Sequence, residues 1–157
     1  MIKEKQIIEM QKSWGEGIIK IGSLKDNRSE CENYTNKFID ELYAFNSGEV
    51  LFKPTKCQTE QFRQTKPKAL SYLISGKNRA CMEDKGFALK PWTNVRFENA
   101  GLILEKSRAF CMGNYFFTDT KGNEIKIEFT FGYILIGEKL KIDLHHSSFP
   151  YSNSNNY

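Results

Sequence analysis

The chain has 157 residues, of which 39% are hydrophobic and 27% charged. This length suits one domain, predicted for residues 1–151, and the polar segment 152–157 is expected to be a disordered tail. The net charge of +4 is spread along the chain without a long basic block, which argues against nucleic-acid binding and leaves a weak field that favours anions.

The N-terminus and the cysteines together predict a cytoplasmic protein without a membrane partner. The opening stretch MIKEKQIIEM is charged and then amphipathic, unlike a signal peptide, and no segment is long enough to span a bilayer. Cys31, Cys57, Cys81 and Cys111 form no CxxC pair, so neither a zinc ribbon nor a disulfide framework is indicated. We therefore expect reduced thiols, most of them buried.

The first 48 residues predict two helices. Apolar residues from Ile7 to Ile21 recur at three- and four-residue spacing, which predicts one amphipathic helix that ends near Gly22. Ser29 and Glu32 fit a capping box, and the apolar stripe that follows them predicts a second helix, ending before residues 47–48.

The middle of the chain predicts short elements. The stretch EVLFKPT is expected to form a strand that Pro54 ends, because proline has no donor for the ladder, and this places Thr55 at a turn. Thr65 can cap a short helix that carries Tyr72 and stops at Gly76. A small hairpin is predicted around CMEDKGFAL.

The remainder predicts four long strands, at about 92–104, 108–119, 123–135 and 139–148, joined by short turns. Between Glu124 and Tyr133 apolar and polar residues alternate, so one face is core and the other is solvated. Helices followed by an antiparallel meander predict an α+β fold. N-terminal helices are expected to pack in a strongly curved antiparallel sheet, with a pocket at its open end.

The last strand ends in HHSS, which holds both histidines of the chain. Continuing the alternation from Leu140, we expect His146 and Ser148 to face inward and His145 and Ser147 outward, unless a bulge intervenes. At a pocket mouth an imidazole can accept a proton and a hydroxyl can donate a hydrogen bond. The alternative is a polar strand end that satisfies neighbouring backbone groups.

A transition-metal site is not predicted. Adjacent histidines on a strand point to opposite faces, and the chain has no third histidine for a three-histidine catalytic site. Mixed ligation through Cys57, Asp84 or Asp143 stays open. Asp84 is equally compatible with capping a turn.

Other polar and aromatic residues have structural interpretations. Thr55 and Tyr72 flank the expected open end of the sheet, but each is compatible with a cap or a half-buried hydroxyl. Trp92 is expected in the core, and Arg96 and Glu98 are expected to form an ion pair on a solvated face. No nucleophile elbow is present, which disfavours a serine hydrolase.

Seven stretches, taken together, resemble the iota-class carbonic anhydrases. They cover residues from about 34 to 151, in the family's order and at compatible distances, and they read LYAFNSGEVLFKPTK, QFRQT, ALSYL, EDKGFALKPWTNVRFENAG, AFCMGNYFFTD, EFTFGY and HHSSFPY. The turn IGEK looks shorter than is usual in the family, which makes residue counting near the C-terminus unreliable.

The resemblance implies a SnoaL-like, nuclear-transport-factor-like cone, also similar to the association domain of calcium/calmodulin-dependent kinase. It implies a homodimer and a lyase that reversibly hydrates carbon dioxide to bicarbonate. Family members are described as working without metal, or with manganese or zinc. The family's bicarbonate-holding hydroxyls would fall on Thr55, Tyr72 and either Ser147 or Ser148.

Our hypothesis from the sequence is metal-free hydration of carbon dioxide. His146, or a relay through Tyr72, would remove the proton of the attacking water, while Thr55 and Ser148 donate hydrogen bonds to the oxygens that gain charge. His145 and Ser147 are kept as the alternative pair that contacts the substrate. An apolar wall is expected from Trp92 together with the strand face that carries residues 129 and 131.

Two other functions remain open from the sequence. A SnoaL-like isomerase or cyclase would need a carboxylate or histidine base deep in a cavity of steroid or polyketide size. A non-catalytic assembly module would have a closed pocket and form a large ring. The polar end of the last strand fits the second alternative poorly.

Overall fold

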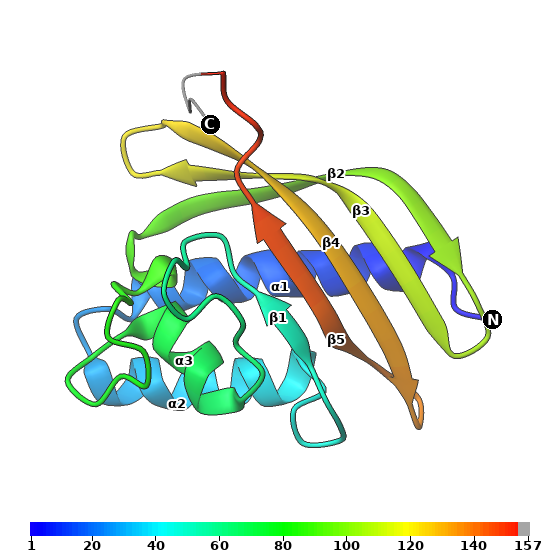
Figure 1. Ribbon diagram of the computed structural model, residues 1–157, viewed down its shortest axis with the longest axis horizontal. Helices are drawn as coiled ribbons and strands as arrows, with labels where there is room; N and C mark the ends of the chain where they lie inside the picture. The colour runs from blue at the N-terminus through cyan, green and yellow to red at the C-terminus, as the bar shows by residue number, and fades with distance from the viewer. Residues whose placement is uncertain (154–157) are drawn as a thin grey trace.

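The computed structural model describes residues 1–153 and contains three α-helices, one short 3-10 helix and five strands (Figure 1). In chain order these are α1 (Glu4–Ser23), α2 (Arg28–Leu42), β1 (Leu51–Lys53), α3 (Lys66–Ile74), η1 (Phe87–Leu89), β2 (Trp92–Leu104), β3 (Arg108–Asp119), β4 (Glu124–Ile136) and β5 (Lys139–Ser148). The predicted helices and the four long strands are all present. The polar tail predicted for 152–157 lies, from residue 154 on, outside the described residues.

The five strands form one sheet in the order β1-β5-β4-β3-β2. All neighbours are antiparallel except β1, which runs parallel to β5. Strands β2 to β5 curve over α1 (Figure 1). Helix α2 packs against α1, and α3 packs against α2. The α+β architecture with helices packed in a curved sheet is therefore confirmed.

Helix α1 packs closely against both the sheet and α2. The apolar residues predicted to form its inner face are buried, among them Ile7, Trp14 and Ile18. Gly17 lies so close to α2 that a Cβ there would come within 2.3 Å of the Phe38 ring. Glycine is therefore required at this position by packing, since a methyl group would separate the two helices.

The core lies on the concave side of the sheet and is rich in aromatic rings. Phe117, Phe129, Phe131 and Tyr133 are all buried, whereas the outward residues at the start of β4 are exposed, as the alternation predicts. Arg96 forms the predicted ion pair with its strand neighbour and lies on the outer face. Burial of large aromatic rings supplies most of the favourable free energy in a domain of this size.

Two local predictions differ from the structure. Helix α2 begins two residues earlier than its supposed capping box, because the Asn27 side chain accepts a hydrogen bond from the Glu30 backbone N–H. The hairpin predicted around residues 81–89 is absent, and turns and η1 occupy that segment. Within residues 1–153 no helix is both long and apolar enough to cross a membrane.

Candidate functional site

Strand β5 contains a bulge next to its polar end. Ile142 opposes Tyr133 of β4, but the next pair joins Leu144 to Gly132, so Asp143 has no residue opposite it. Because side chains alternate between the two faces, one extra residue makes every later side chain of the strand point to the face opposite to the one expected without the bulge.

The bulge decides which histidine and which serine enter the core. His145 and Ser147 are buried, with exposed fractions of 2% and 1%. His146 is exposed and Ser148 is half-buried, both on the outer face of the sheet. The inward orientation predicted for His146 and Ser148 is therefore wrong, and the alternative pair occupies the interior.

The His145 imidazole lies between two tyrosine hydroxyls. The Tyr43 oxygen is 2.8 Å from Nδ1, and the Tyr115 oxygen is 3.2 Å from Nε2. The neighbouring strands place Phe52 and Phe131 beside the ring, with centroid distances of 4.8 and 4.1 Å. Both ring nitrogens are thus hydrogen-bonded, and the apolar neighbours hold the ring in one orientation.

A chain of hydroxyl groups continues from the histidine. The Tyr115 oxygen is 2.5 Å from Ser147 Oγ, which is in turn 2.6 Å from Thr55 Oγ1. Thr55 lies in the same cleft as Tyr72, near enough to lower the pKa of that phenol against the larger upward effect of burial. Residues from five separate parts of the sequence therefore form one polar network through the core.

The network reaches the surface in a cleft of about 710 Å³. Thr55, Tyr72, Phe87 and Trp92 line this cleft together with the loops on either side. The Tyr72 oxygen accepts the Lys56 backbone N–H at 3.1 Å, which leaves the tyrosine's own proton available as a donor. The cleft thus combines two hydroxyl groups with an apolar aromatic wall.

The structure brings Thr55, Tyr72 and Trp92 together in this cleft, whereas residues 129 and 131 lie elsewhere. Phe129 and Phe131 pack around Tyr115 and the buried histidine, at 5.1 Å from the tyrosine ring in the case of Phe129. The prediction that Phe129 and Phe131 line the apolar wall of the cleft is therefore wrong. Their rings instead exclude water from the hydroxyl chain.

The three tyrosines of the network remain protonated. Burial raises the pKa of Tyr43, Tyr72 and Tyr115 far above the ordinary value of 10.0. A phenolate is thus disfavoured at each position, because the apolar surroundings penalise the charged form. The tyrosines can donate hydrogen bonds, but none of them is a base near neutral pH.

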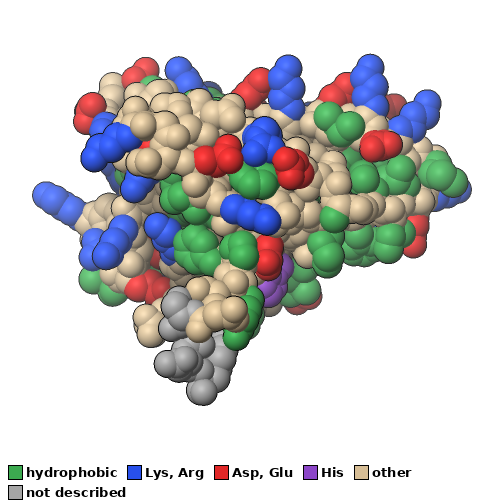
Figure 2. All heavy atoms as spheres, turned by 90° about the horizontal axis from the view of Figure 1, so that it is seen from above, with side chains coloured by type: hydrophobic (Ala, Val, Ile, Leu, Met, Phe, Trp, Pro, Cys, Tyr) green, Lys and Arg blue, Asp and Glu red, His purple; other side chains and the backbone are tan. Residues whose placement is uncertain are grey.

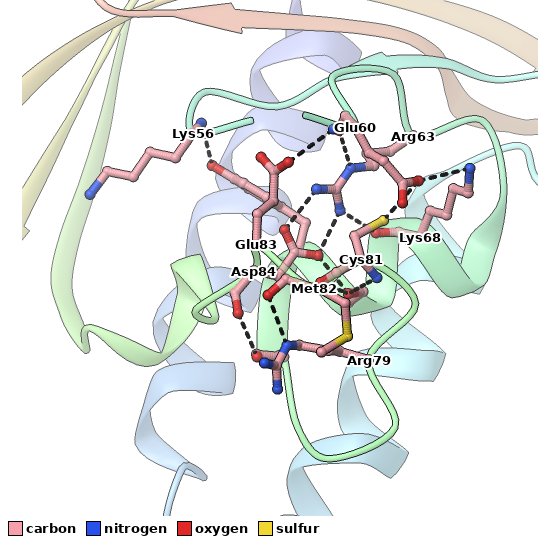
Figure 3. Close-up of polar contacts among 12 residues, drawn as sticks. Lys56, Glu60, Arg63, Lys68, Arg79, Cys81, Met82, Glu83 and Asp84 are labelled. Atoms are coloured by element: carbon pink, nitrogen blue, oxygen red, sulfur yellow. Dashed lines mark hydrogen bonds and ion pairs between the residues drawn. The ribbon is translucent and has the colours of Figure 1, made fainter. Parts of the chain in front are cut away.

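Two carboxylates hold the walls of the cleft (Figure 3). Asp84 and Arg63 form a fully buried ion pair with two N–H···O contacts of 2.7 Å, and Ser71 donates to the same carboxylate. Glu83 accepts the backbone N–H groups of residues 58, 59 and 60 at 2.6 to 2.9 Å. Both carboxylates therefore join the segment 81–85 to the segment 58–63. Because they are occupied in this way, neither is available to a substrate.

The residues considered for mixed metal ligation do not come together. Asp84 pairs with Arg63, and Asp143 accepts a hydrogen bond from Arg108 at 2.7 Å on the other face of the sheet. Cys57 lines the cleft as a thiol whose pKa burial raises to about 12. Among residues 1–153, no group of three or more His, Cys, Asp or Glu side chains is arranged to hold a metal ion.

The buried histidine predicts a specific loss of stability in acid. Burial, followed by the charge of His146, lowers the pKa of His145 to about 3 from 6.5. Below pH 6.5 the unfolded chain therefore binds a proton that the folded chain excludes. The free energy of unfolding should fall by up to about 1.4 kcal/mol per pH unit as the pH drops from about 6.5 to 5, before the carboxylates titrate.

Denaturant unfolding of the wild type and of His145→Gln between pH 5 and 7 measures this slope. The variant should lose most of it, whereas His146→Gln should retain it, because His146 is exposed in the folded chain. An equal slope in wild type and His145→Gln would contradict the assignment.

The sequence does not identify Tyr43 and Tyr115 as polar members of the site. Alternation along β3 places Tyr115 on the inner face beside Phe117, so a tyrosine hydroxyl directed into the core was the available signal. Its partner could not be inferred, because Ser147 lies two strands away.

Comparison with known proteins gives a consistent result. The family model described as metal-independent carbonic anhydrase matches residues 5–149. A protein of that name from Nostoc sp. (strain PCC 7120 / SAG 25.82 / UTEX 2576) is 36% identical over 154 residues, which are 96% of this chain and 75% of the relative.

Solved structures agree with the sequence comparison. The crystal structure of the iota-carbonic anhydrase from a cyanobacterium, complexed with bicarbonate, superposes with a TM-score of 0.92 at 35% identity, over 97% of this chain and 94% of that one. A putative calcium/calmodulin dependent protein kinase II association domain from Xanthomonas campestris has a TM-score of 0.65 at 18% identity, covering 96% and 89%. The second likeness extends to the fold alone.

Proposed function

This chain belongs to the metal-independent carbonic anhydrases, and from that premise we propose how its own residues perform the reaction. The protein catalyses the reversible hydration of carbon dioxide to bicarbonate, in a family defined by working without a metal. The observation that carries the proposal is the hydroxyl chain that ends at Thr55 and Tyr72 on the cleft surface.

Carbon dioxide would lie against the aromatic wall of the cleft. The molecule is apolar, so Phe87 and Trp92 offer it a favourable surface, while its oxygens are within reach of hydroxyl donors. Thr55 and Tyr72 are the donors that contact the substrate. Their position at the edge of a dry network strengthens the hydrogen bonds that they make.

The chemical step adds water to carbon. The oxygen of a water molecule in the cleft forms a bond to the carbon, one C=O π bond opens onto its oxygen, and a proton leaves the water for solvent at the cleft mouth. The developing oxyanion accepts hydrogen bonds from Thr55 and Tyr72, which stabilise the transition state more than the neutral substrate.

Ser147 and His145 act behind the two donors. Ser147 contacts Thr55 directly, and His145 lies one tyrosine further into the core. His145 does not line the cleft, and burial lowers its pKa to about 3, so it is a weak base away from the attacking water and serves here as a positioning residue. His146 and Ser148 point to the outer face of the sheet and have no role in this proposal.

The charge of the cleft suits an anionic product. Lys56, Lys85 and Lys90 line it, whereas Asp84 is neutralised by its arginine and Glu83 is held by three backbone N–H groups. A positive excess at the mouth attracts bicarbonate for the reverse reaction.

We further propose a cytoplasmic homodimer in which residues 1–151 form one catalytic domain. The four free cysteines suit a reducing compartment. The outer face of the sheet exposes Ile103 and Met112 by 61% and 59%, and hydrophobic side chains gather over part of the surface in Figure 2. Such a face is a candidate for pairing with a second copy.

The isomerase or cyclase alternative lacks its base. The cleft is wider than a slot of a few atoms, so its size alone would admit an organic substrate. However, none of its lining residues is a histidine, and both carboxylates that line it are engaged in holding the walls. The alternative is therefore not favoured by the site.

Stopped-flow measurement of carbon dioxide hydration tests the proposal directly. The protein is dialysed against a strong chelator, and the metal content is determined on the same sample. We expect hydration to persist without stoichiometric metal. Activity that disappears on chelation and returns with manganese or zinc would refute the metal-free mechanism, and inactivity under both conditions would refute the function.

A further inference from the structure

The hydroxyl chain begins at a group that can only donate. The indole Nε1–H of Trp14 donates to the Tyr43 hydroxyl oxygen at 3.0 Å in the buried core. On the basis of the proposed function, we infer that Trp14 and Tyr43 are positioning residues. They fix His145 as the tautomer protonated on Nε2 and thereby point every hydrogen bond of the chain toward the substrate.

The first step of the argument concerns Tyr43. Its oxygen accepts the indole proton, so its own hydroxyl proton needs a separate acceptor. The side-chain acceptor within reach is Nδ1 of His145, at 2.8 Å. Nδ1 is therefore unprotonated, and a neutral imidazole must then carry its proton on Nε2.

The direction then passes outward residue by residue. Nε2–H donates to the Tyr115 oxygen, Tyr115 donates to Ser147, and Ser147 donates to Thr55. The Thr55 proton is left to point at Tyr72 or at a substrate oxygen. Within residues 1–153 the only buried side-chain polar atom without a partner is Oδ1 of Asp143, which lies outside this chain.

The packing resists reversal of the ring. Turning the imidazole over would exchange its nitrogens for carbons, and the phenyl rings of Phe52 and Phe131 flank it from β1 and β4. Trp14 also packs edge-on against the ring, at 5.6 Å between centroids. The tautomer is thus set by hydrogen bonds and preserved by close packing.

With this direction, each group of the chain donates toward the cleft, and the chain stops at the Trp14 indole, which cannot accept a proton. A proton that entered at Thr55 would have to leave past Tyr43, but the indole nitrogen of Trp14 cannot accept one. The network therefore cannot conduct a proton from the cleft to the opposite side of the molecule. Its function is to present polarised O–H groups to the oxygen that becomes negative.

Tyr43→Phe tests the inference, because it removes the donor to Nδ1 and keeps the aromatic ring. Both tautomers of His145 then leave Nδ1 without a partner, so neither is selected. In molecules protonated on Nδ1, Tyr115 turns to donate inward and Thr55 no longer presents its proton to the cleft. With the two tautomers about equally populated, we expect the kcat of hydration to fall about twofold, in proportion to the molecules that lose the Nε2 proton, with little change in the KM for carbon dioxide.

The tautomer itself is measured by long-range proton–nitrogen NMR of the imidazole. The chain has two histidines, so a His146→Gln background assigns the signals to His145. In that background we expect His145 to be unprotonated on Nδ1 and protonated on Nε2. When Tyr43→Phe is added, we expect a mixture of both tautomers. Tyr133→Phe is the matched control, because it removes another buried tyrosine hydroxyl outside the chain and should alter neither reading.

A proton on Nδ1 in the background protein, or an unchanged tautomer after Tyr43→Phe, would overturn the inference. Both results can be obtained while the protein remains an active carbonic anhydrase, so they are distinct from failure of the proposed function. Trp14→Phe should also yield a mixture. Because that indole packs against several rings, the decision rests on Tyr43→Phe, which preserves the shape of the core.

Discussion

Thr55→Val is expected to lower the kcat of carbon dioxide hydration about a hundredfold while changing the melting temperature little. Valine has nearly the shape of threonine, so the substitution removes a hydroxyl group without opening a cavity. That hydroxyl is the point where the buried chain meets the cleft. Loss of one well-placed donor to a developing oxyanion costs about 3 kcal/mol in transition-state stabilisation.

Thr59→Val provides the matched control for this substitution. Thr59 lines the same cleft but lies next to Glu83 and outside the hydroxyl chain. Its replacement should leave kcat within about twofold of the wild type. Ser147→Ala should lower kcat as well, since it separates Tyr115 from Thr55, whereas Ser148→Ala should not. Equal activity of Thr55→Val and Thr59→Val would remove Thr55 from the mechanism.

The second large effect concerns the buried ion pair of Arg63 and Asp84. Arg63→Met should lower the free energy of unfolding by about 3–5 kcal/mol, because it leaves a carboxylate in the core without its countercharge. Both side chains have 0% exposed surface, and the guanidinium also donates to the carbonyl oxygens of residues 60 and 68. Urea denaturation of the purified variant measures the change.

The double variant Arg63→Met with Asp84→Leu distinguishes a missing partner from lost packing. It removes both charges, so it should be clearly more stable than Arg63→Met alone. Arg96→Met is the surface control, since that ion pair lies on the solvated outer face, where salt and water screen it, and should contribute little to stability. A cost for Arg63→Met no larger than that of Arg96→Met would show that the buried pair does not hold the fold.

The sequence predicted the elements well because each is encoded locally. The strand predicted at 108–119 is β3 to the residue, and the apolar spacing from Ile7 to Ile21 identified α1. Alternation correctly assigned the two faces of β4. The segment 81–89 failed as a hairpin, since its conformation follows from the contacts of Glu83 and Asp84 with a distant loop.

The site was predicted only in part because it depends on contacts between distant residues. Thr55, Tyr72 and Trp92 do meet in one cleft. The predicted orientation of β5 is wrong from Asp143 onward, because this residue forms a bulge and pairs with Arg108 on the outer face of the sheet. No periodicity within β5 signals such a partner. The hydrogen bonds of Tyr115 could not be inferred either, as alternation specifies a face but not what a hydroxyl meets there.

The bulge decides how the four residues His-His-Ser-Ser are divided between the two faces of the sheet. Each face of the strand receives a histidine and, two residues later, a serine: His145 with Ser147 inside, and His146 with Ser148 outside. A change that abolished the bulge would exchange one pair for the other and still deliver an imidazole and a hydroxyl to the interior. The residue types that face the interior are therefore the same in both registers, whereas the contacts with Tyr43, Tyr115 and Thr55 are those of the bulged strand.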